Sequence, residues 1–297
     1  MIRPVNFGFN EQTAGSNAFQ NRGADQQQVQ DNALQEFDGF VNVLRENGVD
    51  VTVIGDTPDP HTPDSIFPNN WVSFHNDGNV FLYPMQAENR RLERREDVIA
   101  KLEDNFTVKR IIDLSRFELE NKFLEGTGSM VLDRENKIVY ACISPRTNKE
   151  VLALFCQQEG YKEVSFHAFD QSGLAIYHTN VLMCIGSGFA VICLESIKDE
   201  HEKNAVLTML KLTHKEIITI SFAQMNRFAG NMLEVKNKDG ESLIVMSQNA
   251  YKSLKPVQKN VLKKYGEPVY ADINTIETNG GGSARCMMAE VHLPFGS

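Results

Sequence analysis

The chain has 297 residues, of which 41% are hydrophobic and 23% are charged, so it has enough apolar material for a sizeable core. The formal charge is −9 and the pI is near 5.3, which argues against nucleic acid or an anionic membrane as partners because both require clustered cations. The first residues lack the apolar segment of a signal peptide, and no run approaches the ~18 apolar residues of a membrane span. The five cysteines form no CxxC pair and the histidines no paired-ligand pattern. We therefore expect a reduced, cytoplasmic protein without metal or cofactor.

The chain opens with a predicted strand over 2–7, a helix over about 25–47 and a strand over 49–54. The polar, glycine-containing segment 9–28 is predicted to be a surface loop, with a lid over a pocket as the alternative. The short basic run RRLERR at 90–95 is interpreted, for most of its residues, as a solvated helix face.

From residue 65 onward, one unit occurs four times: strand, tight turn, strand, amphipathic helix, strand. The hairpin turns fall near residues 77, 135, 187 and 239, at intervals of 58, 52 and 52 residues. The helices are predicted over about 90–105, 148–159, 199–212 and 250–265.

The remaining segments can complete a fifth copy of the unit. A hairpin is predicted around 283–294, and the strands and helix of residues 2–54 would join it across the termini. Because stacked repeats bury one another's apolar faces, we predict an α/β fold in which ββαβ modules form one closed, pseudo-fivefold propeller domain over 1–297. An open α/β sheet with coincidental alternation is the alternative.

The first strand of each copy carries a polar residue at a matching position. These are Asn70, Glu125, His178, Asn231 and Cys286, at steps of 55, 53, 53 and 55 residues. In a closed ring, equivalent positions approach a common axis, so a thiol, an imidazole, a carboxylate and amides would meet in one pocket. The period therefore predicts a Cys–His–Glu nucleophilic centre assembled from different modules.

The sequence around Cys286 favours a reactive thiolate. The preceding TNGGGSAR allows backbone N–H groups to approach an anion closely, and Arg285 adds positive charge. The other four cysteines lie in or beside apolar runs and are predicted to be buried small hydrophobes: Cys142, Cys156, Cys184 and Cys193.

Five segments together resemble the guanidino-group-modifying enzymes, which include arginine deiminases, dimethylarginine hydrolases and amidinotransferases: NGGGSARCM, LEGTGS, YHTN, SPRTN and PDSIFPNNW. The resemblance extends from the opening RPVNFGFNEQT to the terminal cysteine segment. The GGGS-x-RCM stretch is its most specific part, and the subgroup that it resembles most closely is the citrulline-utilization hydrolase type. The resemblance implies the fivefold ββαβ propeller, called the pentein fold, with a Cys–His–Glu centre.

By this resemblance, Cys286 would attack the planar guanidino or ureido carbon. His178 would protonate the departing amine and then deprotonate the water that resolves the covalent intermediate. Glu125 would hold a substrate N–H or orient the histidine.

The resemblance also implies a set of substrate-binding residues. Arg146 of SPRTN matches an arginine that grips the substrate α-carboxylate, with Arg90 or Arg91 assisting it. Asn231 would shape the pocket, and a small amino acid is the expected partner. A homo-oligomer is compatible with the sequence.

Two positions depart from the family pattern and bear on the substrate. Deiminases place an aspartate two residues after the histidine, and this chain has Asn180 there. The acid that ends the family's strand motif is replaced by Asn70, with Asn69 beside it, whereas Asp64 is retained. A guanidinium offers only donors, whereas a ureido group also offers a C=O acceptor, which an amide N–H can bind. The amides therefore favour a ureido substrate such as citrulline, which would give ornithine, ammonia and carbon dioxide. Ser129, where relatives often carry Asp, is a third departure.

Two alternatives stay open at this point. One is an enzyme that acts on arginine or a modified arginine, as a deiminase, a dimethylarginine-type hydrolase or an amidinotransferase. The other is a non-catalytic propeller that uses the fold for binding, although such a protein would have no reason to keep Cys, His and Glu in register.

Overall fold

The computed structural model describes residues 1–15, 17, 19–20 and 25–296.

Most strands in this part of the chain belong to four copies of one three-stranded sheet unit. In each copy an antiparallel hairpin is followed by a third strand that pairs parallel to the second. The predicted turns all lie between the two hairpin strands, so the repeat is confirmed. The four sheets are β3 (Val72–Phe74), β4 (Asn79–Leu82) and β5 (Arg110–Asp113); β6 (Val131–Asp133), β7 (Ile138–Cys142) and β8 (Lys162–Phe166); β9 (Met183–Ile185), β10 (Phe189–Ile192) and β11 (Glu216–Thr219); and β12 (Leu233–Lys236), β13 (Ser242–Ser247) and β14 (Glu267–Ala271).

Helices connect the second and third strand of each unit. Two of them, α6 (Lys149–Glu159) and α8 (Glu200–Leu212), begin at the predicted residues, because the side chains of Asn148 and Asp199 accept N–H groups of the first turn. The other two predicted helices are divided. Residues 90–105 form α3 (Glu88–Arg91) and α4 (Glu96–Glu103), with extended backbone at Arg95, and residues 250–265 form α10 (Gln248–Ser253) and α11 (Pro256–Leu262). Pro256 occupies the first turn of α11, where its missing N–H costs nothing.

The N-terminal segment forms a fifth, smaller unit. Strands β1 (Ile2–Arg3) and β2 (Ile54–Gly55) pair in parallel, and α2 (Gln26–Glu46), capped by the Asp25 side chain, connects them. The prediction of a surface loop over 9–28 is wrong for the described part of that segment: it contains α1 (Glu11–Ala14) and the first turn of α2, and Asn10, Thr13 and Asn17 are buried. Residues 16, 18 and 21–24 lie outside the described residues. The predicted hairpin at 283–294 is wrong: a short helical turn, η4 (Ala284–Met287), is followed by chain without strand pairing. Pro294 O there accepts Thr107 N at 2.8 Å, so the C-terminal segment is tied to the first unit.

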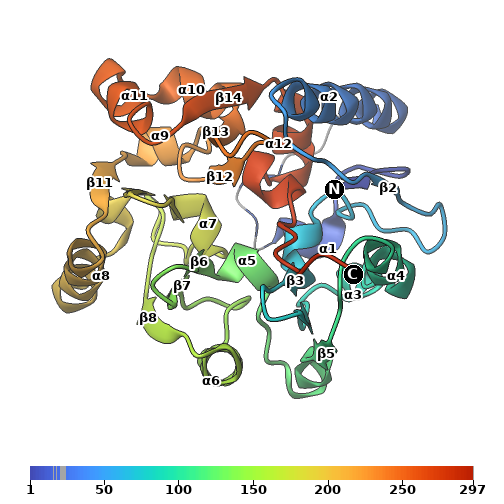
Figure 1. The fold of residues 1–297 in the computed structure, drawn as a ribbon, viewed down its shortest axis with the longest axis horizontal. Coiled ribbons are helices and arrows are strands. Elements are labelled where there is room, and N and C mark those ends of the chain that lie inside the picture. The colour runs from blue at the N-terminus through green and yellow to red at the C-terminus, as the bar shows by residue number, and fades with distance from the viewer. Residues whose placement is uncertain (16, 18, 21–24, 297) are drawn as a thin grey trace.

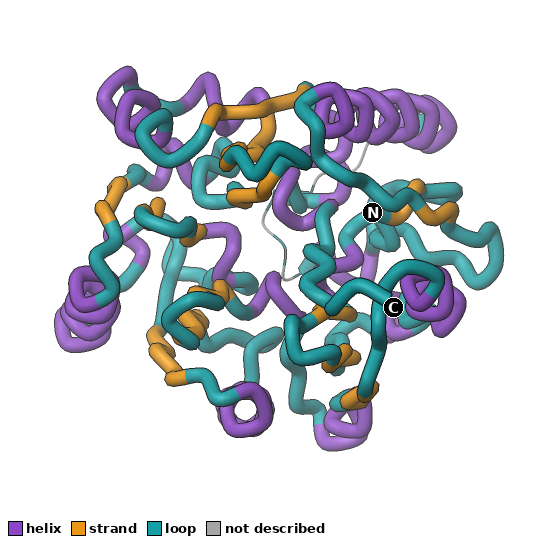
Figure 2. The backbone as a smooth tube through the Cα atoms, viewed as in Figure 1, coloured by secondary structure: helices purple, strands orange, loops and turns teal. Residues whose placement is uncertain are grey.

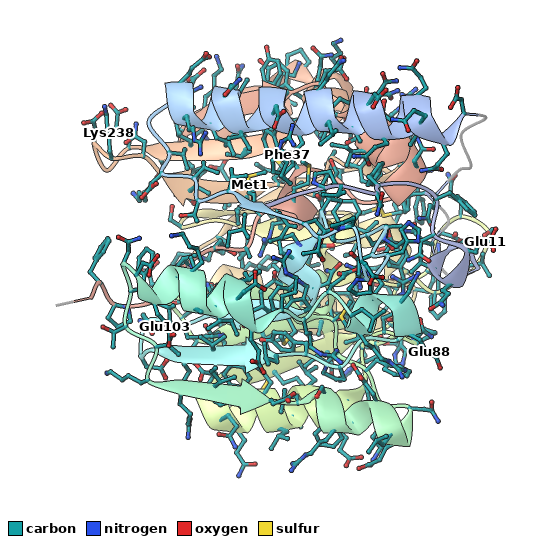
Figure 3. The ribbon with its side chains drawn as sticks, turned by 90° about the vertical axis from the view of Figure 1, so that its right-hand side faces the viewer. Met1, Glu11, Phe37, Glu88, Glu103 and Lys238 are labelled. Atoms are coloured by element: carbon teal, nitrogen blue, oxygen red, sulfur yellow. The ribbon has the colours of Figure 1, made fainter. Side chains whose placement is uncertain are left out.

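The sheets lie around a common centre, with the longer helices outside them and the short turns α5 (Gly126–Ser129) and α7 (Thr179–Leu182) towards the centre (Figure 1). Figure 1 shows α8, α6 and α4 on the periphery, α2 beside α12 (Asn274–Gly280) and β14, and both termini near one another. Figure 2 shows the same distribution by element type. The side view of Figure 3 places Glu11 and Glu88 at one face of the molecule and Glu103 and Lys238 at the other. The fold is mixed α/β, and the hairpin turn that carries Lys238 lies at the face opposite to α1 (Figure 3).

The segments predicted as the starts of the first strands are short helical turns instead. They are η1 (Pro68–Asn70), α5 (Gly126–Ser129), α7 (Thr179–Leu182) and η4. Glycine permits the close packing of α5 on η1: Gly126 has φ +46°, and a Cβ there would lie 2.2 Å from Asn69 O. The turn α5 contacts both η1 and α7, and η1 contacts η4, so these turns bring four of the periodic residues together. The fifth, Asn231, precedes β12 and reaches the Cys286 sulfur with its side chain.

Candidate active site

Cys286 lies in η4 with its sulfur between two amides. Nδ2 of Asn231 is 3.3 Å from Sγ, and Nδ2 of Asn180 is 3.4 Å away. The backbone N–H of Arg285 donates to Oδ1 of Asn231 at 3.0 Å, which turns the Nδ2 of that amide towards the sulfur. The thiol side chain is 5% exposed. Two N–H donors would stabilise a thiolate at this position.

The Arg285 side chain does not supply the positive charge that the sequence suggested. Its guanidinium donates to Met288 O at 2.9 Å and pairs with Glu290 at 2.8 Å. Burial acts to raise the pKa of Glu290, but Arg285 and the neighbouring His292 outweigh burial and hold that pKa well below its usual range. Glu290 therefore compensates the charge of the Arg285 guanidinium, and the groups that donate to the Cys286 sulfur are the amides of Asn180 and Asn231.

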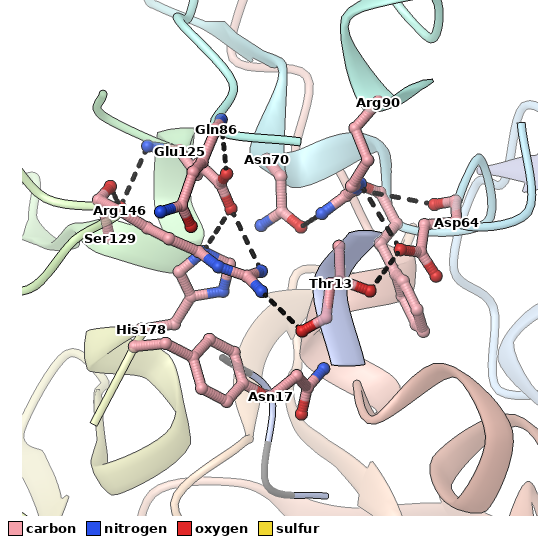
Figure 4. A network of polar contacts seen from close by, with 12 residues as sticks. Thr13, Asn17, Asp64, Asn70, Gln86, Arg90, Glu125, Ser129, Arg146 and His178 are labelled. Atoms are coloured by element: carbon pink, nitrogen blue, oxygen red, sulfur yellow. Dashed lines mark hydrogen bonds and ion pairs between the residues drawn. The ribbon is translucent and has the colours of Figure 1, made fainter. Parts of the chain in front are cut away.

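His178 and Glu125 form a buried pair, shown in Figure 4. Nε2 of His178 is 2.7 Å from Oε2 of Glu125, and both side chains are at most 4% exposed. Burial acts to raise the pKa of Glu125, but Arg146 and the bond to His178 hold it well below its usual range. Burial also lowers the pKa of His178 to about 4, although Glu125 opposes this. An anionic Glu125 accepts a proton-bearing Nε2, so the Nδ1 of a neutral His178 carries the lone pair.

Arg146 is fixed beside this pair. Its guanidinium lies 3.5 Å from Oε2 of Glu125 and stacks 4.9 Å from the ring centre of Tyr177. Ser129 joins the two segments, because its hydroxyl accepts Glu125 N at 2.9 Å and donates to Arg146 O at 2.7 Å. This gives the third sequence departure a structural role.

A second guanidinium, that of Arg90, lies on the opposite side of Asn70. It donates to Oδ1 of Asn70 at 2.9 Å and to Glu93 at 2.8 and 2.9 Å, and it lies 3.8 Å from Asp64. Burial raises the pKa of Glu93 to about 7 despite Arg90, and burial also raises the pKa of Asp64. Arg90 and Glu93 are 2% and 3% exposed, so the interpretation of RRLERR as a solvated face is wrong for these two residues.

The predicted site residues surround a cavity of about 20 Å³. Six of them line it: Asp64, Asn70, Arg90, Arg146, His178 and Cys286. The others lie behind these residues. Glu125, Asn180 and Asn231 contact His178 or Cys286, whereas Asn69 donates to Thr127 at 3.2 Å.

Several lining residues were not identified from the sequence. Tyr177 supports Arg146 and donates its hydroxyl to Gly281 O at 2.8 Å, and Asn17 donates to Gly280 O at 3.3 Å. Tyr177 directly precedes the histidine in YHTN, which could have drawn attention to it. Asn17 lies in a polar segment with no periodic signal, and nothing in the sequence singles it out.

Buried polar atoms at the cavity lack partners in the described part of the chain. Nδ2 of Asn70 and Oδ1 of Asp64 belong to cavity-lining residues, and Oδ1 of Asn180 lies behind the sulfur. Because buried polar groups are normally hydrogen-bonded, a donor and acceptors left open here favour a polar ligand. The residues described contain no His, Cys, Asp and Glu group suited to a metal ion, and no helix among them is long and apolar enough to cross a membrane.

Gly128 sets the close approach of two site residues. An added Cβ would lie 2.4 Å from Asn70 Nδ2 and 2.9 Å from His178 Nδ1, so Gly128→Ala must displace both. We expect kcat/KM to fall roughly 10²-fold, because small displacements of catalytic groups are costly. Steady-state kinetics and an unfolding curve measure the effect. Gly39→Ala is the control: it lies within α2 with no atom close to its Cβ, and it should keep the rate. Full activity in Gly128→Ala would contradict the proposed packing.

Comparisons with known proteins place the chain among enzymes of arginine chemistry. The family described as N,N dimethylarginine dimethylhydrolase, eukaryotic, matches residues 3–293. No curated protein gave a match. The substrate-bound N-terminal domain of ArgZ, a cysteine-to-serine variant of an arginine dihydrolase from cyanobacteria, has a TM-score of 0.77 at 18% identity, over 99% of this chain and 97% of that one. A dimethylarginine dimethylaminohydrolase adduct has a TM-score of 0.60 at 15% identity, over 87% and 90%.

The chain corresponds to only part of the longer ArgZ protein. Against the apo structure of ArgZ the TM-score is 0.76 at 16% identity, and the alignment covers 98% of this chain but 40% of that chain. At such identities the structural likeness shows a shared fold.

Proposed function

Because the chain belongs to the N,N-dimethylarginine dimethylhydrolase family of guanidino-group-modifying hydrolases, we propose that its substrate is arginine and that Cys286 forms the covalent intermediate. The observation that carries this proposal is the placement of the Cys286 sulfur between two amide donors, next to a cavity shared with His178, Arg90 and Arg146. A thiol nucleophile, an acid–base imidazole and two guanidiniums that can bind a carboxylate are the groups that hydrolysis of a guanidino amino acid requires.

The charges around the cavity favour a cationic substrate. Three buried carboxylates, those of Asp64, Glu93 and Glu125, accompany two guanidiniums. Asp64 lines the cavity and its Oδ1 has no partner, and burial raises its pKa, so its ionised form lacks sufficient compensation. A bound guanidinium would supply the missing cation, whereas neutral citrulline would not. Together with the family match, this supports the guanidino alternative better than citrulline as the substrate that enters.

The amides suit the ureido group that the first hydrolysis would form. Loss of one ammonia and addition of water convert the guanidino group into a ureido group with a new C=O. The open Nδ2 of Asn70 can donate to this oxygen, because its Oδ1 is held by Arg90. A second hydrolysis would then release ammonia and carbon dioxide and leave ornithine, so that arginine and two waters give ornithine, two ammonia and carbon dioxide. Citrulline would be the bound intermediate of this sequence.

In the first step, the sulfur of Cys286 bonds to the guanidino carbon and the tetrahedral adduct expels ammonia. His178, neutral at the start, takes the thiol proton of Cys286 on Nδ1 as the C–S bond forms and passes it to the departing nitrogen. It then removes a proton from the attacking water, whose addition breaks the C–S bond and returns the sulfur as thiolate. Glu125 keeps the imidazole oriented throughout. Arg146 and Arg90 are the proposed ligands of the α-carboxylate.

The finer features of the fold belong to the same proposal. A closed pseudo-fivefold propeller that forms one domain over 1–297 would place all five periodic residues on its axis. A cytoplasmic location and the oligomeric state stay predictions from the sequence.

Product stoichiometry tests the proposed function. Purified protein should be supplied separately with arginine, citrulline and dimethylarginine, while ammonia, dimethylamine, citrulline and ornithine are quantified. Arginine converted to ornithine with two ammonia supports the proposal. Release of citrulline with one ammonia would indicate a deiminase, and dimethylamine release without arginine turnover would favour the second candidate, the dimethylarginine hydrolase that the family match suggests.

Asn70→Asp should separate the two hydrolytic steps. The carboxylate can still accept from Arg90 but has no N–H for the ureido oxygen, so arginine should be hydrolysed once and citrulline released. We expect the ammonia yield per arginine to fall from two towards one. Asn69→Asp is the matched control, because that side chain bonds Thr127 and does not line the cavity. An unchanged yield of two in Asn70→Asp would exclude this role.

A further inference from the structure

The loop that carries the nucleophile contains three consecutive glycines and is held by its neighbours. Residues 280–282 connect α12 to the turn with Cys286. A Cβ at either Gly280 or Gly282 would lie 2.8 Å from the Phe67 ring, so the loop packs directly against that ring. Such a loop has little intrinsic preference for one conformation, because glycine restricts the backbone least. Its geometry must come from contacts outside the glycines.

One such contact is made by Glu277, a buried carboxylate that the chemistry above does not use. The hydroxyl of Ser283 donates to its Oε1 at 2.6 Å, and Nδ2 of Asn249 donates to its Oε2 at 2.6 Å. The carbonyl of the same Ser283 accepts the backbone N–H of Cys286 at 2.9 Å. Ser283 therefore links the two residues: its hydroxyl binds the Glu277 carboxylate and its carbonyl binds the backbone N–H of Cys286.

The helix that bears Glu277 is itself anchored. No side chain of α12 caps its first turn; instead, Glu36 of α2 accepts Thr275 N at 2.8 Å and Ile276 N at 3.0 Å. Figure 1 shows α12 beside α2, in agreement with their contacts. The base of the nucleophile loop is thus fixed to the long N-terminal helix.

We propose that Glu277 is a positioning residue that holds the Cys286 loop in its reactive geometry through Ser283. The inference rests on the proposed role of Cys286 as the nucleophile. The carbonyls of Gly280 and Gly281 would stay bound to Asn17 and Tyr177, but loss of the bond to Ser283 would release the end of the loop next to Cys286 and let the sulfur leave the two amides.

If the Glu277 side chain only filled space, an apolar side chain of similar size would make the folded state more stable. Glu277 is 3% exposed, and the donors to its oxygens are neutral. Burial raises its pKa, although hydrogen bonds from Ser247, Ser283 and Asn249 oppose this. An ionisable group in such a place lowers stability relative to an apolar residue of similar size. What the carboxylate adds is two directional acceptors, one of which fixes the loop.

The experiment compares five variants for kcat, KM, Cys286 alkylation and thermal stability. Glu277→Gln and Ser283→Ala each weaken the bond, and the double variant tests whether they act through one path. Thr278→Ala is the matched control, since that residue is the exposed neighbour on α12. Alkylation by iodoacetamide, with Cys286 identified by peptide mass spectrometry, reports on the thiol without any substrate.

We expect kcat to fall ~10- to 100-fold in each single variant while KM changes less than ~3-fold, because a displacement near 1 Å has this effect on rate. Alkylation of Cys286 should slow in parallel, and the double variant should be no slower than the worse single variant. Adding Asn249→Asp to Glu277→Gln restores a donor–acceptor pair with the charge moved, and it should recover part of kcat.

Unchanged kcat, losses that multiply in the double variant, or a rise of KM alone would overturn the inference. The last result would instead make Glu277 a substrate contact, because it also lines a second cavity of about 800 Å³. If arginine proved not to be the substrate, alkylation would still decide the role of Glu277, so the two proposals can fail separately.

Discussion

Cys286→Ala should abolish turnover of arginine, with a loss of at least about 10⁴-fold in kcat, because no covalent intermediate can then form. The substitution leaves the other residues that line the cavity unchanged, including Asp64, Arg90 and Arg146, so the variant should still bind substrate. Isothermal titration with arginine, alongside an ammonia assay, measures binding and turnover separately.

Cys156→Ala is the control for this prediction. Cys156 lies in α6, where burial raises the pKa of its thiol to about 12. This control variant should keep the wild-type rate. Appreciable turnover by Cys286→Ala would remove the thiol from the mechanism and leave water activated by His178 as the nucleophile.

His178→Gln should lower kcat by about 10²- to 10⁴-fold, which is the range of a general acid–base residue. The Gln amide N–H can still donate to Glu125, so the carboxylate keeps a partner, but the amide cannot transfer protons. Since burial lowers the pKa of His178 to about 4, the imidazole is neutral at pH 7 and its loss removes a base rather than a charge.

Rapid-quench kinetics with mass spectrometry should locate the defect. If His178 delivers the hydrolytic water, the variant should accumulate a substrate adduct on Cys286. The exposed His201 provides the control substitution, His201→Gln. A variant with wild-type kcat would assign proton transfer to another group.

The sequence identified the site because its parts recur at a fixed spacing. Residues 53 to 55 apart on successive modules proved to meet around Cys286, and this follows from strand pattern and turn chemistry alone. The local backbone was less predictable. Apolar runs such as that before Asn70 read as strand, yet Pro68 and the close approach of Gly126 make them short helical turns.

Other features depend on contacts that no local pattern encodes. Arg285 follows the glycines and suggested an activating charge, but Glu290 binds its guanidinium. The interpretation of most of RRLERR as a solvated face included Glu93, and only the three-dimensional fold buries this carboxylate against Arg90. The substrate is equally hard to predict from the sequence, because burial and neighbours from other modules set the pKa of each carboxylate near the cavity.

The proposed reacting groups come from separate modules, which determines when the site can form during folding. Glu125, His178 and Cys286 are contributed by turns that hold their places only by packing on one another. A nascent or partly unfolded chain therefore carries a thiol without its base and a base without its orienting acid. If Cys286, His178 and Glu125 act as proposed, the site is complete only once η4 has packed against η1, so turnover should appear no earlier than the folding of that segment.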